Sequence, residues 1–395
     1  MSGSVLVLGN SNRKVRKAYG AGSHRIEDNA GPMNEVSGAV PRQVIPVVAG
    51  ITFFALMAYA HGQIVGNPTR GRAVFEQYCV LCHGSDAKGM GLLAKTLPVP
   101  PADLTDCRRT SEDPVDVIEG TIRHGGSYVR LSPVMPAWQG TLTDEQITDA
   151  ASYVKTLCRD PDWVPGELNL PRPLITDKAY PEQEAIVGGR LGRGPSKTTE
   201  AFGTIEYRLN GLTNVELTTS YLNVRPDGGQ PDSGLGDSVL SLNRVVAFSQ
   251  ANRWLTSAGL GLGLPTGSQS RGLGSGDLVW EPFVRGGWDW HQVVIQGDAV
   301  LSLPQKNTDV NSVFMYDVAI GRYFKPEPRM QITPMIEFNS ETPLNGPTSS
   351  VTKSVVLPEI RVQWLHWSTA VGVQVPITGA RDFNTRPMFD FTYEF

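Results

Sequence analysis

Two cysteines and a histidine lie within five residues of one another, at positions 79–83 (CVLCH). At the spacing of Cys79 and Cys82, two thiols on one helical turn can each form a thioether with one vinyl group of the same porphyrin. The following residue, His83, then lies under the iron as an axial imidazole. A zinc site would need a second pair of ligands, and the other cysteines, Cys107 and Cys158, have no such partners. The segment therefore predicts one covalently attached haem c.

The second axial position of this iron has three candidate residues, two methionines and one histidine. Met90 follows His83 by only seven residues, too few to reach the opposite face of the ring. Met135 lies in a loop between two prolines, which stiffen the backbone and can hold a thioether sulfur at a fixed distance. We predict Met135 as the sixth ligand, with His124 and an open coordination position as the alternatives.

The residues around the motif predict a small, mostly helical domain over residues 67–160. A helix is expected to start at residues 67–69 (NPT), and a second to cover residues 114–124. A third opens at residues 143–146 (TDEQ), which have the pattern of a capping box. Residues 161–183 contain five prolines and little periodicity, and we predict that they form a linker.

From residue 184 onward, apolar and polar residues alternate with the period of two that is typical of β-strands. Residues 386–395 show it best: Phe389, Phe391, Tyr393 and Phe395 point one way, and Asp390 points the other. Turns are expected at residues 210–211 and 286–287, among others. The pattern predicts ten to twelve strands of about ten residues, the length that crosses a bilayer when tilted.

Two features favour an outer-membrane β-barrel over residues 184–395 rather than a soluble β-sandwich or lipocalin-like barrel. Six of the eight tryptophans fall in this region, mostly near expected strand ends, as in the aromatic girdles of membrane barrels. The apolar face is continuous across many strands, and the other face is small or charged. Polar residues expected to face the lumen are Glu216, Asp298, Asp317, Glu359 and Arg361.

The N-terminal residues predict export from the cytoplasm. Residues 1–60 are interpreted as an N-terminal extension and a signal peptide whose apolar segment covers residues 44–60, with cleavage after Ala60; Met33 is an alternative start. An uncleaved transmembrane helix is the competing interpretation. Export would place Cys107 and Cys158 where disulfides form, so we predict that they pair, the alternative being two unrelated buried thiols.

The overall charge excludes one class of partner. The 395 residues have a formal net charge of −4, and no basic segment with interleaved aromatic residues occurs. Nucleic acid is therefore not an expected partner.

On these residues, positions 69–158 resemble a class I monohaem cytochrome c. The resemblance rests on Gly71, Phe75, the 79–84 motif, Met135-Pro136 and Tyr153. It implies that the first and last helices cross, with Gly71 and Phe75 meeting Tyr153. It also implies that residues 100–104 pass the haem edge. Trp138 is expected either to hydrogen-bond a haem propionate or to pack in the core.

The whole arrangement is similar to cytochrome–porin fusions used for extracellular electron transfer, including iron-oxidising ones. It departs from the iron-oxidising type because the haem domain is a full-size cytochrome with a methionine ligand candidate. We therefore expect an electron carrier tethered to the outer membrane, with the cytochrome on the periplasmic side. Its expected partners are outer-membrane lipid and a redox protein or extracellular electron donor or acceptor.

Two other functions are weighed against this one. The first is a porin-like transport channel with the cytochrome as a periplasmic plug, sensor or docking module. The second is an enzyme such as a peroxidase, which needs an open haem position or a second haem. Only one CxxCH segment occurs in the sequence, so an enzyme is not expected.

Overall fold

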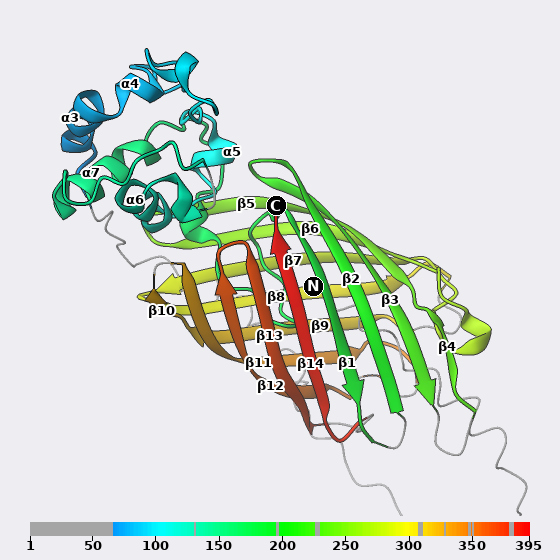
Figure 1. Ribbon diagram of the computed structural model, residues 1–395. Helices are drawn as coiled ribbons and strands as arrows, with labels where there is room; N and C mark the ends of the chain where they lie inside the picture. Colours follow the sequence, from blue (N-terminus) through cyan, green and yellow to red (C-terminus); the bar gives the residue numbers. More distant parts are fainter. Residues whose placement is uncertain are drawn as a thin grey trace, which may run out of the picture.

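The computed structural model describes residues 66–129, 132–194, 197–225, 230–306, 311–327, 329–346, 349, 351–378 and 383–395. The expected signal peptide and its cleavage site after Ala60 lie outside these residues. The described chain forms a helical domain followed by an antiparallel barrel (Figure 1), which confirms the expected α + β multidomain class. No helix in this part of the chain has the length and apolar character needed to cross a membrane.

The helical domain starts where the capping residues place it. Its helices are α3 (Pro68–Tyr78), α4 (Val80–His83), α5 (Cys107–Thr110), α6 (Val115–His124) and α7 (Asp144–Lys155), with 3-10 turns η2 (Ala94–Thr96) and η3 (Gly126–Val129). The side chain of Asn67 accepts hydrogen bonds from the first backbone amides of α3. At α7, Thr143 and Gln146 form the expected capping box.

Helices α3 and α7 cross at a glycine. A Cβ atom on Gly71 would lie 1.9 Å from the carbonyl oxygen of Asp149, so only glycine allows this approach. One turn further along, the rings of Phe75 and Tyr153 pack with centroids 5.4 Å apart. The expected contact of Gly71 and Phe75 with Tyr153 is therefore confirmed.

Among the described residues, twelve long strands form the barrel, within the predicted ten to twelve. They are β1 (Glu184–Gly192), β2 (Lys197–Asn210), β3 (Thr213–Arg225), β5 (Ser238–Ser249), β6 (Trp254–Leu264), β7 (Val279–Trp290), β8 (Val293–Pro304), β9 (Val313–Arg322), β11 (Met330–Pro343), β12 (Lys353–Trp364), β13 (Trp367–Thr378) and β14 (Arg386–Glu394). Each pairs antiparallel with its neighbours, and β14 pairs with β1 to close the barrel. Two short strands, β4 (Asp232–Leu235) and β10 (Phe324–Glu327), pair antiparallel with β3 and β11.

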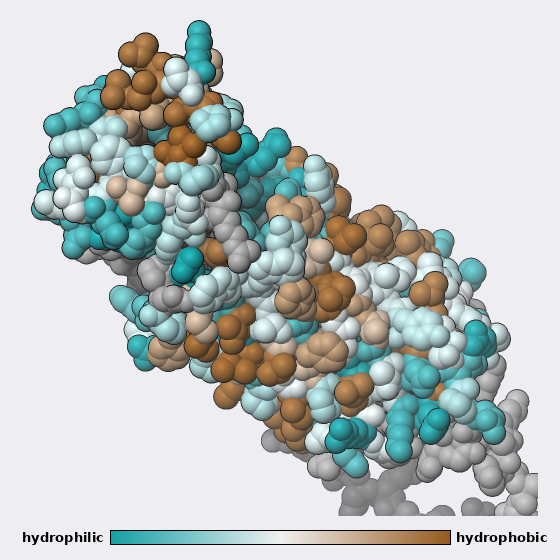
Figure 2. Space-filling model, in the orientation of Figure 1, coloured by the Kyte–Doolittle hydropathy of each residue, from teal (hydrophilic) through white to brown (hydrophobic). Residues whose placement is uncertain are grey.

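The outer wall of the barrel is apolar and its interior is polar, as the alternation predicts. In β14, Phe389 and Phe391 are 49% and 44% exposed, whereas Asp390 between them is 1% exposed. Figure 2 shows apolar residues along the outer wall of the barrel and a separate apolar area on the helical domain. An apolar exterior around a closed set of strands with no free edge is what a lipid bilayer requires.

The two ends of the barrel differ in their connections. At the end called here the short-turn end, two to four residues join β2 to β3, β5 to β6, β7 to β8 and β12 to β13. At the opposite end, four residues join β1 to β2, and the other connections are seven to fourteen residues long. The helical domain lies against the short-turn end (Figure 1).

The prediction of a turn at residues 286–287 is wrong. Gly286 and Gly287 lie inside β7, and the turn falls at His291 and Gln292 instead. A Cβ atom on Gly287 would lie 2.8 Å from Leu170 of the linker. The glycine therefore makes room for a segment inside the barrel rather than for a turn.

The proline-rich linker follows a path that the sequence did not predict. After the 3-10 turn η4 (Gly166–Leu168), residues 169–183 enter the barrel lumen at the short-turn end. The segment reaches Glu337, near the middle of β11, and then returns to the same end, where β1 begins. Residues 170–182 are all buried.

Candidate functional site

The cysteine and histidine side chains lie on a single turn of helix at the end of α3. The backbone amide of Cys79 donates to the carbonyl oxygen of Phe75, and the carbonyl oxygen of Cys79 accepts from Cys82 and His83 at 3.2 and 2.9 Å. The chain therefore turns at Cys79 and continues directly into α4. Both thiols and the imidazole are half-buried.

The His83 ring is oriented by the loop that the family resemblance predicted beside the haem edge. Its Nδ1 lies 3.2 Å from the carbonyl oxygen of Ala102. If Nδ1 carries the proton and donates to this oxygen, Nε2 has a lone pair available for a metal. Burial lowers the pKa of His83, and the hydrogen bond to Ala102 opposes the shift. The neutral form that binds iron is thus favoured at neutral pH.

The environment of Cys79 keeps its free thiol protonated. Burial, with a smaller contribution from the neighbouring Cys82, raises the pKa of Cys79 to about 11. A thiol of this kind is not activated as a nucleophile at neutral pH, in contrast to the cysteines of thiol enzymes.

Met135 lies in a loop held against the end of α6. Its carbonyl oxygen accepts from the backbone amide of Gly126 at 3.1 Å. A Cβ atom on Gly125 would lie 2.8 Å from the same oxygen, so the loop packs closely on the turn after α6. The Met135 side chain packs against the buried cluster that includes Val74 and Ile122, and Tyr78, next to Cys79, packs against it too. The structure thus brings Met135 to the core that adjoins the end of α3.

The remaining ligand candidates lie in less suitable surroundings. Met90 is 71% exposed. His124 is exposed at the end of α6, where its ring packs on Tyr128 with centroids 5.1 Å apart. Trp138 packs edge-on against Tyr78 at 5.6 Å, which gives it a core contact.

These residues fit a c-type haem on the chemistry of their donor atoms. Cys79 and Cys82 would hold the porphyrin covalently, and His83 and Met135 would supply an imidazole nitrogen and a thioether sulfur to its iron. Apolar side chains border the motif, as a porphyrin requires, and several remain exposed: Leu81, Leu92, Leu93 and Val99. A haem with both axial positions filled supplies one-electron chemistry and has no open position for a substrate.

A disulfide connects two helices of the domain. Cys107, the first residue of α5, and Cys158, just after α7, are bonded with an S–S distance of 2.00 Å. The bridge ties the loop that follows the haem motif to the last helix. Such a cross-link restricts the unfolded chain and so stabilises the domain.

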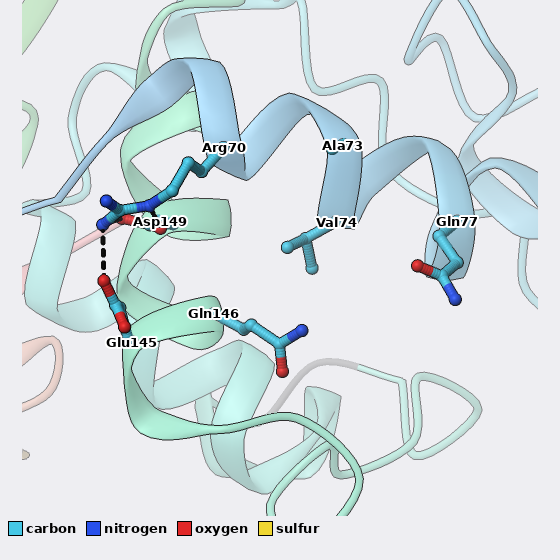
Figure 3. Close-up of a pocket in the computed structure, with 7 residues that line it drawn as sticks. All are labelled: Arg70, Ala73, Val74, Gln77, Glu145, Gln146 and Asp149. Atoms are coloured by element: carbon cyan, nitrogen blue, oxygen red, sulfur yellow. Dashed lines mark hydrogen bonds and ion pairs between the residues drawn. The ribbon is translucent and has the colours of Figure 1, made fainter.

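The groove between α3 and α7 contains a shallow pocket (Figure 3). Arg70 forms an ion pair with Glu145 at 2.7 Å across its edge, and its Nε donates to Asp149 at 2.6 Å. Gln77 and Gln146 line the rest of the pocket. These contacts hold the two helices together at their crossing.

The sequence did not reveal the residues that hold the linker and the barrel against the helical domain. Glu167, in the linker, accepts from Lys155 of α7 at 3.2 Å and from the backbone amide of Val115 at 2.9 Å. Glu112 pairs with Arg208 of β2 at 3.1 Å. These partners are far apart in the sequence, so no local pattern marks them.

Comparison with known proteins identifies the helical domain. Residues 66–154 match the family model described as cytochrome C oxidase, cbb3-type, subunit III. Residues 66–154 form a cytochrome c domain. The match implies haem c as its cofactor. The described chain joins this cytochrome c domain to a closed antiparallel barrel.

Several solved structures are similar to the chain at low identity. The COG4313 outer membrane channel from Pseudomonas putida F1 is 12% identical, with 57% of this chain and 100% of that chain covered, at a TM-score of 0.43. The KdgM porin is 11% identical over 54% of this chain and 99% of that one, at 0.35. The β domain of the Bordetella autotransporter BrkA is 11% identical over 54% and 97%, at 0.36.

Proposed function

We propose that this protein is an electron carrier anchored in the outer membrane, with a single covalently attached haem c ligated by His83 and Met135. The observation that carries the proposal is the one-turn arrangement of Cys79, Cys82 and His83 with the imidazole oriented by Ala102. Methionine ligation raises the reduction potential relative to bis-histidine ligation, so the haem would act as a high-potential relay.

The protein's own residues determine how this relay works. Cys79 and Cys82 retain the cofactor in a domain too small to bury it fully. His83 and Met135 would both ligate the iron, and a haem held in this way would supply one-electron transfer without binding a substrate. Because no substrate binds and no group is transferred, we propose that the chain is not an enzyme.

The proposed location follows from the barrel. Membrane barrels have short periplasmic turns and longer extracellular loops. The cytochrome c domain lies at the short-turn end, which would be the periplasmic side. The haem motif on α4 lies on the side of the domain away from the barrel (Figure 1), where a periplasmic redox protein could reach it.

The ligands can be tested by absorption spectroscopy of the purified protein. The wild-type protein should show a c-type spectrum and the red-region band of thioether–iron ligation. We expect Met135→Ala to abolish this band and the matched surface variant Met90→Ala to retain it. Persistence of the band in Met135→Ala would exclude Met135 as the ligand.

The route of the electrons can be tested in intact cells with a membrane-impermeant reductant. If the relay is periplasmic, the haem should be reduced only after the outer membrane is permeabilised. Reduction in intact cells would instead support an extracellular route, as in the cytochrome–porin fusions that the chain resembles.

A shift of the His124→Ala spectrum away from wild type would reopen the choice of axial ligand.

A further inference from the structure

The linker inside the barrel makes more polar contacts than a passive connection needs. The guanidinium of Arg172, which is 5% exposed, pairs with Glu206 of β2 at 2.6 Å and with Glu184 of β1. Its carbonyl oxygen accepts from Arg361 of β12. The linker is thus bound to the barrel wall on two sides at this level.

Two and four residues further along the linker, backbone amides donate to carboxylates of β12 and β11. Leu174 donates to Glu359 at 3.0 Å, and Thr176 donates to Glu337 at 2.6 Å through both its amide and its hydroxyl group. Both carboxylates are buried, so each contact replaces hydrogen bonds to water that the barrel wall would otherwise need.

At its deepest point the linker forms an ion pair with a third part of the wall. The carboxylate of Asp177 accepts from Arg285 of β7 at 2.6 Å, and its backbone amide donates to Asp298 of β8 at 2.8 Å. Asp177 and Arg285 are 2% and 3% exposed. A charge buried this deeply is tolerated only with a partner, so the linker and the wall depend on each other.

The linker also makes apolar contacts with the barrel wall and a hydrogen bond to its own chain. Leu170 occupies the space that Gly287 leaves in β7. Leu174 packs with Leu357 and Ala370 of the wall in a fully buried cluster. Across the base of the loop, the Tyr180 hydroxyl donates to the carbonyl oxygen of Val164 at 3.4 Å. The loop therefore has one defined conformation rather than the freedom of a linker.

We propose that residues 169–183 are a lumenal plug that closes the barrel to ions and hydrophilic solutes. Contacts on β1, β2, β7, β8, β11 and β12 hold the plug around much of the circumference of the barrel. The barrel then serves as a sealed anchor for the cytochrome c domain rather than as an open channel. This proposal does not depend on how the haem is ligated or on its redox partner.

The plug can be tested by conductance of the full-length protein in planar lipid bilayers. We expect the wild-type protein to carry almost no steady current. In Arg172→Ala/Asp177→Ala, Glu206 and Arg285 of the wall lose the oppositely charged partners that the plug supplies, which favours withdrawal of the loop. The open probability should rise by about 100-fold, because unpairing buried charges strongly destabilises the closed arrangement. The matched control Asp162→Asn, at an exposed position before the plug, should stay closed.

A second measurement keeps the test valid if the double variant fails to fold. Ala179 lies in the plug and is 2% exposed, so Ala179→Cys should react with a membrane-impermeant maleimide about 100-fold more slowly than Asp162→Cys. A steadily conducting wild-type barrel would overturn the proposal. Equal labelling of the two cysteine variants in the folded barrel would overturn it as well.

Discussion

Replacing Gly71 by alanine should destabilise the cytochrome c domain more than any other single methyl addition in α3. The added Cβ atom would lie 1.9 Å from the Asp149 carbonyl oxygen, 2.5 Å from its carbonyl carbon and 2.9 Å from Cβ of Tyr153. Two of these atoms belong to the backbone of α7, so no side-chain rotation can relieve the overlap. The two helices would have to separate by more than 1 Å, on the basis of ordinary contact distances.

The cost of that separation can be estimated from what the crossing contains. Overpacking in a well-packed core typically costs about 1–3 kcal/mol. Moving α3 from α7 would also weaken the ring contact of Phe75 with Tyr153, worth about 1 kcal/mol. We therefore expect Gly71→Ala to lower the free energy of unfolding of the domain by about 3 kcal/mol.

The assay is urea unfolding of the full-length protein in detergent, followed by the haem absorption band so that only the cytochrome c domain is observed. Gly140→Ala is the matched control. Its backbone φ of +86° disfavours alanine, but a Cβ there would meet nothing within 4 Å. The control should cost about 1 kcal/mol. A urea midpoint for Gly71→Ala that is no lower than the midpoint for Gly140→Ala would refute the steric argument.

Three further predictions concern other parts of the chain. Hydrogen bonds from Arg70 lower the pKa of Asp149. The stability that these bonds give the domain should therefore be present at neutral pH and lost as the pH falls below about 4. The difference in urea midpoint between wild type and Asp149→Asn should shrink over that range. Cys107→Ser/Cys158→Ser should cost up to about 4 kcal/mol in the same assay, and reduction of the wild type should match it. Val371→Arg, on the outer wall, should lower the free energy of unfolding in bilayers by about 2–4 kcal/mol and so reduce the folded fraction seen by gel mobility without heating. No change in that fraction would contradict a lipid-facing position.

The sequence predicted most of the cytochrome c domain because its determinants are local. The haem motif, the cap at Asn67 and the capping box at Thr143 depend on residues within four positions of each other, and the structure has both caps at those residues. The pairing of Cys107 with Cys158 needed a second argument, from the export signal. The position of Met135 relative to the iron depends on the path of a long loop, which no local pattern describes.

The barrel was predicted from the alternation of apolar and polar residues. The plug was missed because that alternation is absent from it. A strand buried on one face repeats every two residues, so the orientation of side chains such as Asp390 follows from the sequence. The plug has no such period, because its backbone and side-chain groups contact several strands in no regular order. One available signal was charge: Arg172, Asp177, Lys178 and Glu182 lie in a segment whose other residues are prolines, apolar residues and a few uncharged polar ones. Gly287 was a second signal, but together with Gly286 it was interpreted as a turn.

The path of the plug has a mechanical consequence. Residues 169–183 enter and leave the barrel by the same end, with Val164 bonded to the Gly211 turn and β1 beginning beside it. The loop is therefore inserted but not threaded, and neither half of the chain has to pass through the other. The cytochrome c domain can fold before or after the barrel closes. A force on that domain, directed away from the membrane, would draw out the loop first and leave all twelve strands paired.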